Sequence, residues 1–410
     1  MTKSSIVTVA GGIYRERCMH PPWDRFFGSG GRAASALATM GVPVELYTYT
    51  DQLAAESFAC EAALSGITLR STPVSATPSF HYTHGLSVPT IHGGEQKYTP
   101  IEIKASDVLR FGMIEGDAII RADRAVYDPQ NAVDPQPFAA NGSTATELAL
   151  VLNRHEARLF LGQNSDEVDD ESAARALADK EKAAVVVIKR GPRGALVFDR
   201  GTITTVPAYQ TQRVWKIGSG DNFAAHFACA WLNDGLPAHE AANHASHATA
   251  YFCEHGGIYA SRSELNHFSR QPINVSSAWS KGDRPTVYLA GPFFNLPQLW
   301  LVEQARTALM DMGLKVFSPY HDVGHGSAED VVGKDLQAIH DSALMLALAD
   351  GLDTGTIYEI GYARAISHPV IVYSESESNE DRKMMEGSGC VITDDFVTAI
   401  YHTVWEAARV

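Results

Sequence analysis

The sequence predicts an α/β protein built from two domains. Its 410 residues are enough for about two or three domains. Short apolar strands alternate with amphipathic helical segments along most of the chain, which is typical of a mostly parallel sheet covered by helices. This alternation stops at residues 271–285 (QPINVSSAWSKGDRP), a stretch rich in turn formers, and then restarts. We therefore expect one domain over 1–270, a linker over 271–285 and a second domain over 286–410.

In the first domain, strands that end in glycine or proline are followed by helices. The stretch at 71–99 is rich in Ser, Thr and Pro and alternates in polarity, so we expect a small sheet or lid there. Residues 195–199 (ALVFD) are expected to pair as a hairpin with the strand before them. The other expected elements are strands at 6–12, 44–50, 125–129 and 183–191, and helices at 30–41 and 221–235.

In the second domain the same alternation predicts a doubly wound parallel sheet. Apolar residues at helical spacing mark helices over 299–312, 331–339 and 396–404, and a further helix should run to about Ile366. The expected strands are 286–291, 315–319, 343–348 and 368–373. Ligands of such sheets bind at the carboxyl ends of the strands, so we expect the site there.

Composition narrows the possible partners and the compartment. A formal charge of −15 argues against a general nucleic-acid or membrane-surface role, although local backbone donors could still hold a small anion. The five cysteines are scattered, which favours a reducing compartment. The sequence shows no signal peptide or membrane-spanning stretch, so a cytoplasmic location is expected.

The stretch ADGLDTGTIYEIGYARA, residues 349–365, places acidic groups where a buried strand gives way to a helix. Glu359 is expected in the first turn of that helix, where the helix dipole favours an ionised carboxylate. Such a residue can be a simple helix-starting charge, or a nucleophile that attacks a sugar anomeric carbon. In the second case a nearby carboxyl group, Asp353 or Asp335, could protonate the leaving base.

The motifs YLAGPFF (288–294), KDL (334–336) and DTGTIYEIGYA (353–363) together resemble the nucleoside 2-deoxyribosyltransferase family, over about residues 285–410. The resemblance implies a flavodoxin-like fold and cleavage of the N-glycosidic bond of a 2′-deoxynucleoside. The deoxyribosyl group then passes to another base, or to water in hydrolase relatives. It also implies roles for six residues: Glu359 as nucleophile, Asp353 and Asp335 near the sugar or the leaving base, and Tyr288, Gly291 and Asp350 in substrate binding.

Two other features of this domain stay open. His321, Asp322 and His325 could read the base, or could bind nothing; no residue is assigned to a metal. The family resemblance also implies that a neighbouring subunit completes the site, for which Asn379–Gly389 is the candidate element, so a homo-oligomer is expected.

In the first domain, KIGSGDNFAAHFA (216–228) is the strongest local signal. Backbone N–H groups around Gly218 and Gly220, at a helix start, can converge on an anion such as a phosphoryl group. Asp221 could accept a proton from an attacking hydroxyl, or could simply cap the helix.

Together with GSGGRAASALATMG (28–41), FLGQNSDEV (160–168) and IKRGPRGALVF (188–198), this motif resembles the ribokinase-like (PfkB) carbohydrate kinases over roughly residues 5–268. The resemblance implies ATP and Mg²⁺ as cofactors. Glu16 or Asp24 could stand in for the family's substrate-binding aspartate. The remaining implied roles are an anion hole at Gly218, Ser219 and Gly220, Asp221 as base, Asn164 and Glu167 at Mg²⁺ and phosphate, and Gly30 and Gly31 at the sugar site.

The prediction is a bifunctional enzyme of nucleoside or nucleotide metabolism, acting on small molecules. The second domain would transfer a deoxyribosyl group, and the first would phosphorylate a sugar or nucleoside hydroxyl. The alternative is a nucleoside or nucleoside-monophosphate hydrolase whose kinase-like domain is not catalytic and serves in oligomerisation or ligand sensing.

Overall fold

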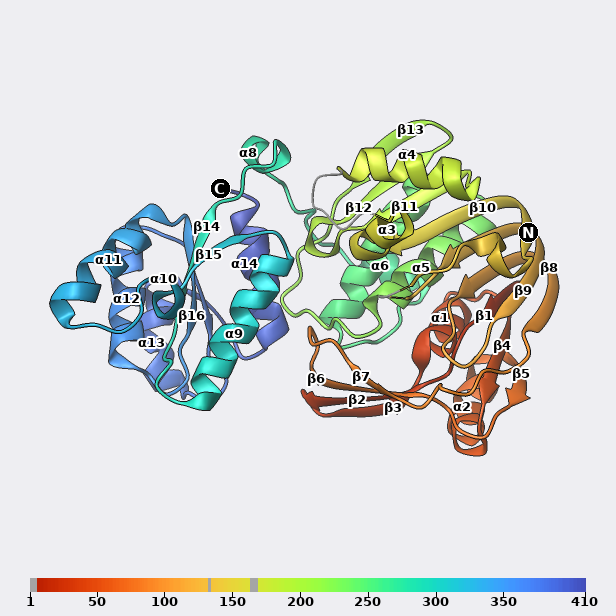
Figure 1. Ribbon diagram of the computed structural model, residues 1–410, viewed down its shortest axis with the longest axis horizontal. Coiled ribbons are helices and arrows are strands. Elements are labelled where there is room, and N and C mark those ends of the chain that lie inside the picture. Colours follow the sequence, from red (N-terminus) through yellow and green to blue (C-terminus); the bar gives the residue numbers. More distant parts are fainter. Residues whose placement is uncertain (1–5, 132–133, 163–168) are drawn as a thin grey trace. The chain divides into compact units, whose positions relative to one another are not determined.

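The computed structural model describes residues 6–131, 134–162 and 169–410. These residues form two compact units (Figure 1). The first unit contains Met1–Thr211 and Trp215–Pro272; the second contains Gln212–Val214 and Ile273–Val410. Residues 273–285 belong to the second unit and include helix α8 (Ser277–Ser280), whose Trp279 is buried.

The first unit is built on a nine-stranded sheet in the order β13-β12-β11-β10-β9-β8-β1-β4-β5. All neighbouring strands are parallel except β11–β12 and β12–β13, so the predicted hairpin at 195–199 is confirmed. The strands are β1 (Val7–Ala10), β4 (Val44–Thr50), β5 (Thr68–Pro73), β8 (Ile101–Phe111), β9 (Ala118–Asp128), β10 (Thr144–Asn153), β11 (Val185–Lys189), β12 (Ala195–Asp199) and β13 (Thr202–Val206).

Helices cover both faces of this sheet. Alternate strand residues, such as Val7 and Val9 on one face and Ala10 on the other, join two separate apolar cores. The first core is covered by α1 (Gly28–Thr39), α2 (Gln52–Ser65), α5 (Ser219–Ala228), η3 (Cys229–Asn233), α6 (Ala238–Glu254) and α7 (Arg262–His267). The second core is covered by η1 (Phe138–Asn141), α3 (Arg154–Phe160) and α4 (Asp170–Glu181); a short turn η2 (Gly191–Arg193) follows β11.

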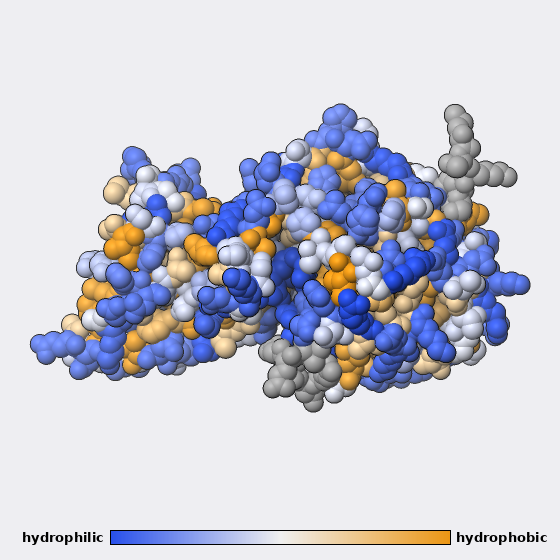
Figure 2. Space-filling model, turned by 90° about the horizontal axis from the view of Figure 1, so that it is seen from above, coloured by the Kyte–Doolittle hydropathy of each residue, from blue (hydrophilic) through white to orange (hydrophobic). Residues whose placement is uncertain are grey.

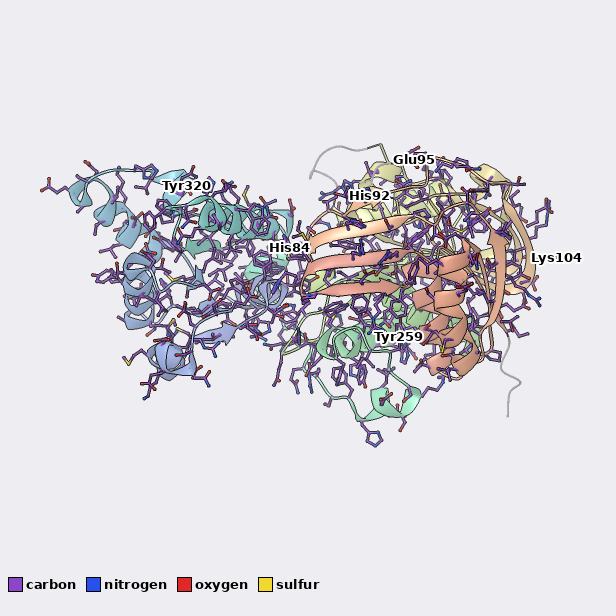
Figure 3. All side chains as sticks on the ribbon, turned by 90° about the horizontal axis from the view of Figure 1, so that it is seen from below. His84, His92, Glu95, Lys104, Tyr259 and Tyr320 are labelled. Carbon is purple, nitrogen blue, oxygen red and sulfur yellow. The ribbon has the colours of Figure 1, made fainter. Side chains whose placement is uncertain are left out.

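A small four-stranded sheet, called the lid here, completes the first unit. Its order is β3-β2-β6-β7, formed by β2 (Arg15–His20), β3 (Trp23–Phe26), β6 (Ser79–His84) and β7 (Thr90–His92). Figure 3 labels His84 and His92 on it. The predicted sheet within 71–99 is therefore confirmed, but its other half comes from residues 15–26, between the first strand and the first helix.

The second unit is an all-parallel five-stranded sheet in the order β15-β14-β16-β17-β18. The strands are β14 (Thr286–Ala290), β15 (Lys315–Phe317), β16 (Leu344–Leu348), β17 (Val370–Tyr373) and β18 (Val391–Thr393). In chain order this is 2-1-3-4-5, the flavodoxin-like arrangement, which confirms the predicted fold class. The strand order reverses between β14 and β16, and ligands of such sheets bind at that position.

Six helices surround the second sheet. They are α9 (Leu296–Asp311), α10 (Pro319–Asp322), α11 (Ala328–Asp341), α12 (Thr354–Ala365), α13 (Asn379–Gly387) and α14 (Phe396–Ala407). One apolar core joins Ile339 of α11, Ile360 of α12 and Met385 of α13 to the strands. On the other face of the sheet, α9 contacts α14 (Figure 1).

The surface of the protein mixes hydrophilic and apolar residues. On the face drawn in Figure 2, apolar residues form separate patches among hydrophilic ones. Across 6–131, 134–162 and 169–410, no helix is long and apolar enough to cross a membrane.

Candidate functional sites

The second unit brings a tyrosine and a glutamate together at the point where its strand order reverses. The hydroxyl of Tyr288, on β14, donates a hydrogen bond to Oε1 of Glu359, on α12, at 2.7 Å. Tyr288 is 0% exposed and Glu359 is partly buried, so the tyrosine side of the bond lies in the core and the glutamate side at its edge. Because the tyrosine ring is packed in the core, its hydroxyl fixes where the Glu359 carboxylate lies.

The expected position of Glu359 in the first helical turn is wrong. Asp353 is the N-cap of α12, and its carboxylate accepts from the Thr356 backbone N–H at 2.9 Å. Helix α12 therefore begins at Thr354, and Glu359 falls in the second turn, where the helix dipole acts weakly.

Burial, and not the helix dipole, controls the protonation of Glu359. Burial raises the pKa of Glu359 to about 7, and the charges of Asp335 and Asp353 add to this, while the hydrogen bond from Tyr288 acts in the opposite direction. Burial, followed by the Glu359 carboxylate, also raises the pKa of Tyr288, so the tyrosine remains a hydrogen-bond donor. Near neutral pH Glu359 can exist in both protonation states.

Asp335, on α11, completes a group of acidic side chains. Its Oδ1 atom is buried and has no hydrogen-bond partner among the residues that the structure describes. Burial raises the pKa of Asp335, and the neighbouring Lys334 opposes the shift. Buried carboxyl oxygens normally find partners, so the lack of one for Oδ1 among the described residues makes this atom a candidate hydrogen-bonding group for a ligand.

Two other predicted substrate-binding residues have structural roles. The Asp350 carboxylate accepts from the backbone N–H groups of Glu375, at 2.9 Å, and Ser376, at 2.8 Å, and so ties the end of β16 to the end of β17. Gly291 follows β14 directly, and a Cβ there would lie 3.1 Å from Cβ of Leu348. Gly291 therefore allows the ends of β14 and β16 to approach closely.

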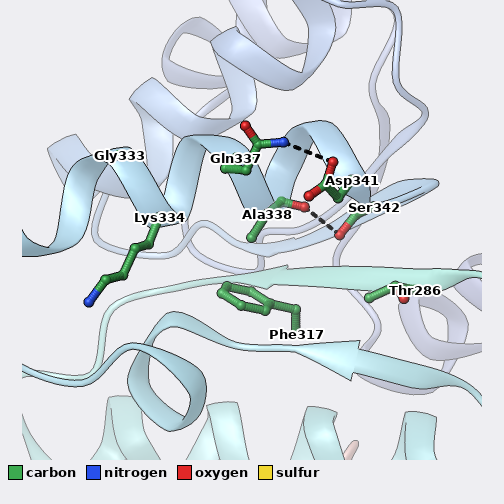
Figure 4. A pocket seen from close by; sticks show the side chains of 8 residues that line it. All are labelled: Thr286, Phe317, Gly333, Lys334, Gln337, Ala338, Asp341 and Ser342. Atoms are coloured by element: carbon green, nitrogen blue, oxygen red, sulfur yellow. Dashed lines mark hydrogen bonds between the residues drawn. The ribbon is translucent and has the colours of Figure 1, made fainter.

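A groove of about 660 Å³ runs between α11 and the edge of the sheet (Figure 4). Phe317 of β15 lines the groove, and its ring stacks on Tyr288 with centroids 5.6 Å apart. The remaining lining residues are Thr286, Gly333, Lys334, Gln337, Ala338, Asp341 and Ser342.

The three residues after β15 that could read the base, His321, Asp322 and His325, have different partners in the structure. His321 Nε2 lies 2.8 Å from Oε1 of Glu303, and Oδ2 of Asp322 accepts from the Ser318 N–H, so both are used within the fold. His325 instead joins an aromatic cluster with Phe293, at 5.8 Å between ring centroids, and Tyr320.

In the first unit, the glycine motif forms the start of α5. Gly218 is the N-cap with φ of 77°, a left-handed conformation that suits glycine. A Cβ on Gly218 would lie 1.9 Å from Nε of Arg32, so the Arg32 side chain packs directly against this turn.

Asp221, in the first turn of α5, is buried among charged groups. Its Oδ2 lies 3.2 Å from Nη1 of Arg32, and Oδ1 accepts from Nε2 of Gln130. Burial raises the pKa of Asp221, and Arg32 opposes the shift. Of the two candidates for a substrate-binding acid, Glu16 also pairs with Arg32, whereas Asp24 pairs with Arg15 on the lid.

Two lysines lie beside the same helix start. Lys189 Nζ pairs with Oδ2 of Asp128, and Lys216 Nζ donates to Oγ of Ser219 at 3.1 Å. Burial raises the pKa of Asp128 to about 7, and Lys189 opposes this shift. Burial, together with the charge of Lys189, lowers the pKa of Lys216. Two cations next to the positive end of a helix favour a bound anion.

The predicted pair Asn164 and Glu167 lies outside the described residues. The structure reveals a second Asn-x-x-Glu pair at Asn153 and Glu156, at the carboxyl end of β10. Asn153 caps α3 in a capping box with Glu156, and Glu156 is buried. Burial raises the pKa of Glu156, and Lys189 opposes this. The signal in the sequence was an Asn-x-x-Glu spacing that directly follows the apolar strand LALVL.

The early glycine pair has a packing role at the start of α1. A Cβ on Gly30 would lie 2.4 Å from the backbone oxygen of Gly11, and one on Gly31 would lie 3.0 Å from the Phe58 ring. Within the described part of the chain, no group of three or more His, Cys, Asp or Glu side chains could hold a metal ion by itself.

Comparisons with known proteins identify the two kinds of domain. Residues 129–265 match the model of the pfkB family of carbohydrate kinases, and residues 287–394 match that of nucleoside 2-deoxyribosyltransferase. The chain therefore combines a pfkB-type carbohydrate kinase domain with a nucleoside 2-deoxyribosyltransferase domain, as its motifs indicated. No curated protein sequence matches this chain.

Solved structures resemble the first unit in fold. The Methanocaldococcus jannaschii nucleoside kinase, an archaeal member of the ribokinase family, is 12% identical, with a TM-score of 0.50, over 65% of this chain and 98% of that one. The Burkholderia thailandensis nucleoside kinase in complex with inosine is 18% identical, with a TM-score of 0.49, over 65% of this chain and 99% of that one. Ribokinase from Thermotoga maritima is 16% identical, with a TM-score of 0.49, over 64% and 98%.

Proposed function

We propose that the second unit cleaves the N-glycosidic bond of a 2′-deoxynucleoside and transfers the deoxyribosyl group to another base. The observation that carries this proposal is the partly buried Glu359 carboxylate, which Tyr288 holds near Asp335 at the point where the strand order reverses. A positioned carboxylate of this kind suits nucleophilic attack on an anomeric carbon.

In the proposed reaction, Glu359 attacks C1′ and forms a glycosyl ester as the bond from C1′ to the base nitrogen breaks. The departing base takes a proton. Asp335 is the better candidate for that acid because its Oδ1 is free, whereas Oδ2 of Asp353 already accepts from the Thr356 N–H and hydroxyl. A nitrogen of a second base then attacks C1′, restores the Glu359 carboxylate and loses its proton.

Product analysis tests this proposal. The protein is incubated with a deoxynucleoside, with and without a second free base, and the products are separated by chromatography. A new nucleoside supports transfer, whereas free deoxyribose alone supports the hydrolase alternative. Glu359→Gln should reduce turnover at least about 10³-fold. The control Glu329→Gln, at an exposed position on α11, should leave turnover unchanged. Full turnover in Glu359→Gln would refute the proposed nucleophile.

For the first unit we propose phosphoryl transfer from ATP to a sugar or nucleoside hydroxyl, with Asp221 as the base. The start of α5 and the flanking Lys189 and Lys216 suit the transferring group. The fully buried Oδ1 of Asp128, which has no partner in the described structure, and the nearby Glu156 would hold Mg²⁺ together with the phosphates. Bound Mg²⁺ would neutralise charge that builds on the phosphoryl oxygens.

One observation favours a second candidate for this unit. Asp221 is already paired with Arg32 and Gln130, so the unit could bind ligands without transferring phosphate. Phosphate transfer from ATP to a panel of sugars and nucleosides separates the two. Transfer that is lost in Asp221→Asn supports the kinase, and ATP binding without any transfer supports ligand sensing.

A further inference from the structure

The proposed acceptor side of the kinase-like site is organised around one buried arginine. Arg32 is 2% exposed, and its guanidinium forms a fork with Glu16, from Nη1 to Oε1 at 2.8 Å and from Nη2 to Oε2 at 2.6 Å. The same Nη1 also lies 3.2 Å from Oδ2 of Asp221. Arg32 thus connects the residue proposed as base to a second acid.

Glu16 and Arg32 belong to different parts of the unit. Arg32 is on α1, in the body, whereas Glu16 is on lid strand β2, where it pairs with Arg25 of β3 and Phe80 of β6. If strand β2 moved away from α1, Glu16 would move with it. The two parallel N–H groups of Arg32 that now hold Glu16 would then lose their bidentate acceptor, beside the proposed base.

The Glu16–Arg32 geometry is the one that a bound anion would adopt. An arginine fork binds a carboxylate and a phosphate in the same bidentate way, through two parallel N–H···O bonds. A neutral acceptor in the place of Glu16 offers no charge, so the buried guanidinium would keep Asp221 as its only carboxylate among these two. An acceptor with its own phosphate would replace Glu16 directly.

We propose that the acceptor of the first unit carries a phosphomonoester, which binds the Arg32 fork in place of Glu16. This inference rests on the proposed phosphoryl transfer and specifies its acceptor: a sugar phosphate or a nucleoside monophosphate, and not a neutral sugar or nucleoside. Arg32 is then a residue that determines specificity, and Glu16 is a built-in competitor for the same site.

The test compares how tightly matched ligands bind to the full-length protein. Calorimetry measures binding of ribose and ribose 5-phosphate, of 2-deoxyribose and its 5-phosphate, and of inorganic phosphate alone, all without ATP. Each phosphosugar should bind at least about tenfold more tightly than its neutral partner, as expected for hydrogen bonds to a charged group, and more tightly than inorganic phosphate. Equal binding of a neutral sugar and its phosphate would overturn the inference, as would inorganic phosphate binding as tightly as the phosphosugars.

Two variants should shift binding in opposite directions. Arg32→Met removes the fork and should abolish the preference for phosphosugars. Glu16→Gln removes the competing charge but keeps its shape, so phosphosugars should bind more tightly than to the unchanged protein, and this variant remains informative if Arg32→Met does not fold. Arg70→Met, which breaks the exposed pair with Glu45, is the matched control and should change nothing. Weaker phosphosugar binding in Glu16→Gln would contradict the inference.

The experiment also separates this inference from the proposed function. A phosphosugar preference without any phosphate transfer from ATP would support the binding of a phosphomonoester at Arg32 and reject the kinase. Transfer to neutral sugars in preference to their phosphates would retain the kinase and reject the role of Arg32.

Discussion

At the scale of single residues, the protonation of Glu359 gives the clearest prediction. A nucleophilic carboxylate must be ionised, and burial raises the pKa of Glu359 to about 7. Glycosidic cleavage should therefore increase with pH through about 7. Because the Tyr288 hydrogen bond lowers this pKa, Tyr288→Phe should move the midpoint of the pH profile upward and reduce turnover by roughly 10²-fold. Initial rates between pH 5 and pH 9 would measure both effects, and an unshifted midpoint would show that Tyr288 does not control the carboxylate.

The same shift predicts how stability depends on pH. The folded-state pKa of Glu359 lies above the ordinary value of 4.5, so the folded protein binds more protons than the unfolded chain between these values. The contribution of Glu359 to stability is therefore largest at low pH and decreases as pH increases through about 7. In Glu359→Gln, the free energy of unfolding of the second unit, measured with urea, should decrease less over this pH range than in the unchanged protein. The same decrease in both proteins would contradict the raised pKa of Glu359.

Sequence motifs identified the neighbourhood of both sites, but not how charges pair inside them. The Tyr288–Glu359 contact spans 71 positions in the chain, and the Arg32–Asp221 contact spans 189, so no local pattern reports them. The pair Asn153 and Glu156 could have been predicted from the local sequence, because an Asn-x-x-Glu motif directly follows an apolar strand. The helix dipole was expected to favour an ionised Glu359, but Glu359 lies in the second helical turn and burial raises its pKa to about 7.

At the scale of elements, the start of α12 positions Glu359. The Asp353 cap sets the first helical residue, and each residue of helix rotates the following side chains by about 100°. Asp353→Ala should remove the cap and destabilise the second unit by about 1 kcal/mol. Asp353→Asn keeps a capping oxygen, so a loss of activity in Asp353→Asn without a loss of stability would indicate a direct role in chemistry. Urea unfolding and turnover of both variants distinguish these possibilities.

Buried strands were the most predictable elements. The segment at 344–348 is short and wholly apolar, which follows from burial on both faces of a parallel sheet. The lid was only partly predictable because its strands β2 and β3 are polar and half-exposed, as in RERCMH. Such strands depend on long-range pairing with β6, which alternation within one segment does not reveal.

At the scale of the whole molecule, the two units have separate apolar cores and separate proposed sites. Gly218→Ala places a side chain in a left-handed position and against Arg32, so it should destabilise the first unit by at least about 1–2 kcal/mol. Glycosidic cleavage by the second unit should remain unchanged. Calorimetry of the full chain and chromatographic turnover would check both parts, and a parallel loss of cleavage would show that the two activities depend on each other.

The second unit is not one continuous piece of chain, because it includes Gln212–Val214. The Val214 N–H donates to Oγ1 of the fully buried Thr398 on α14 at 2.9 Å. A fragment that begins at residue 273 would lack this donor and the buried Val214 side chain. Proteolytic cleavage within 271–285 should therefore yield two pieces that elute together in size-exclusion chromatography. Any engineered separation of the two domains would need to keep residues 212–214 with the deoxyribosyltransferase domain.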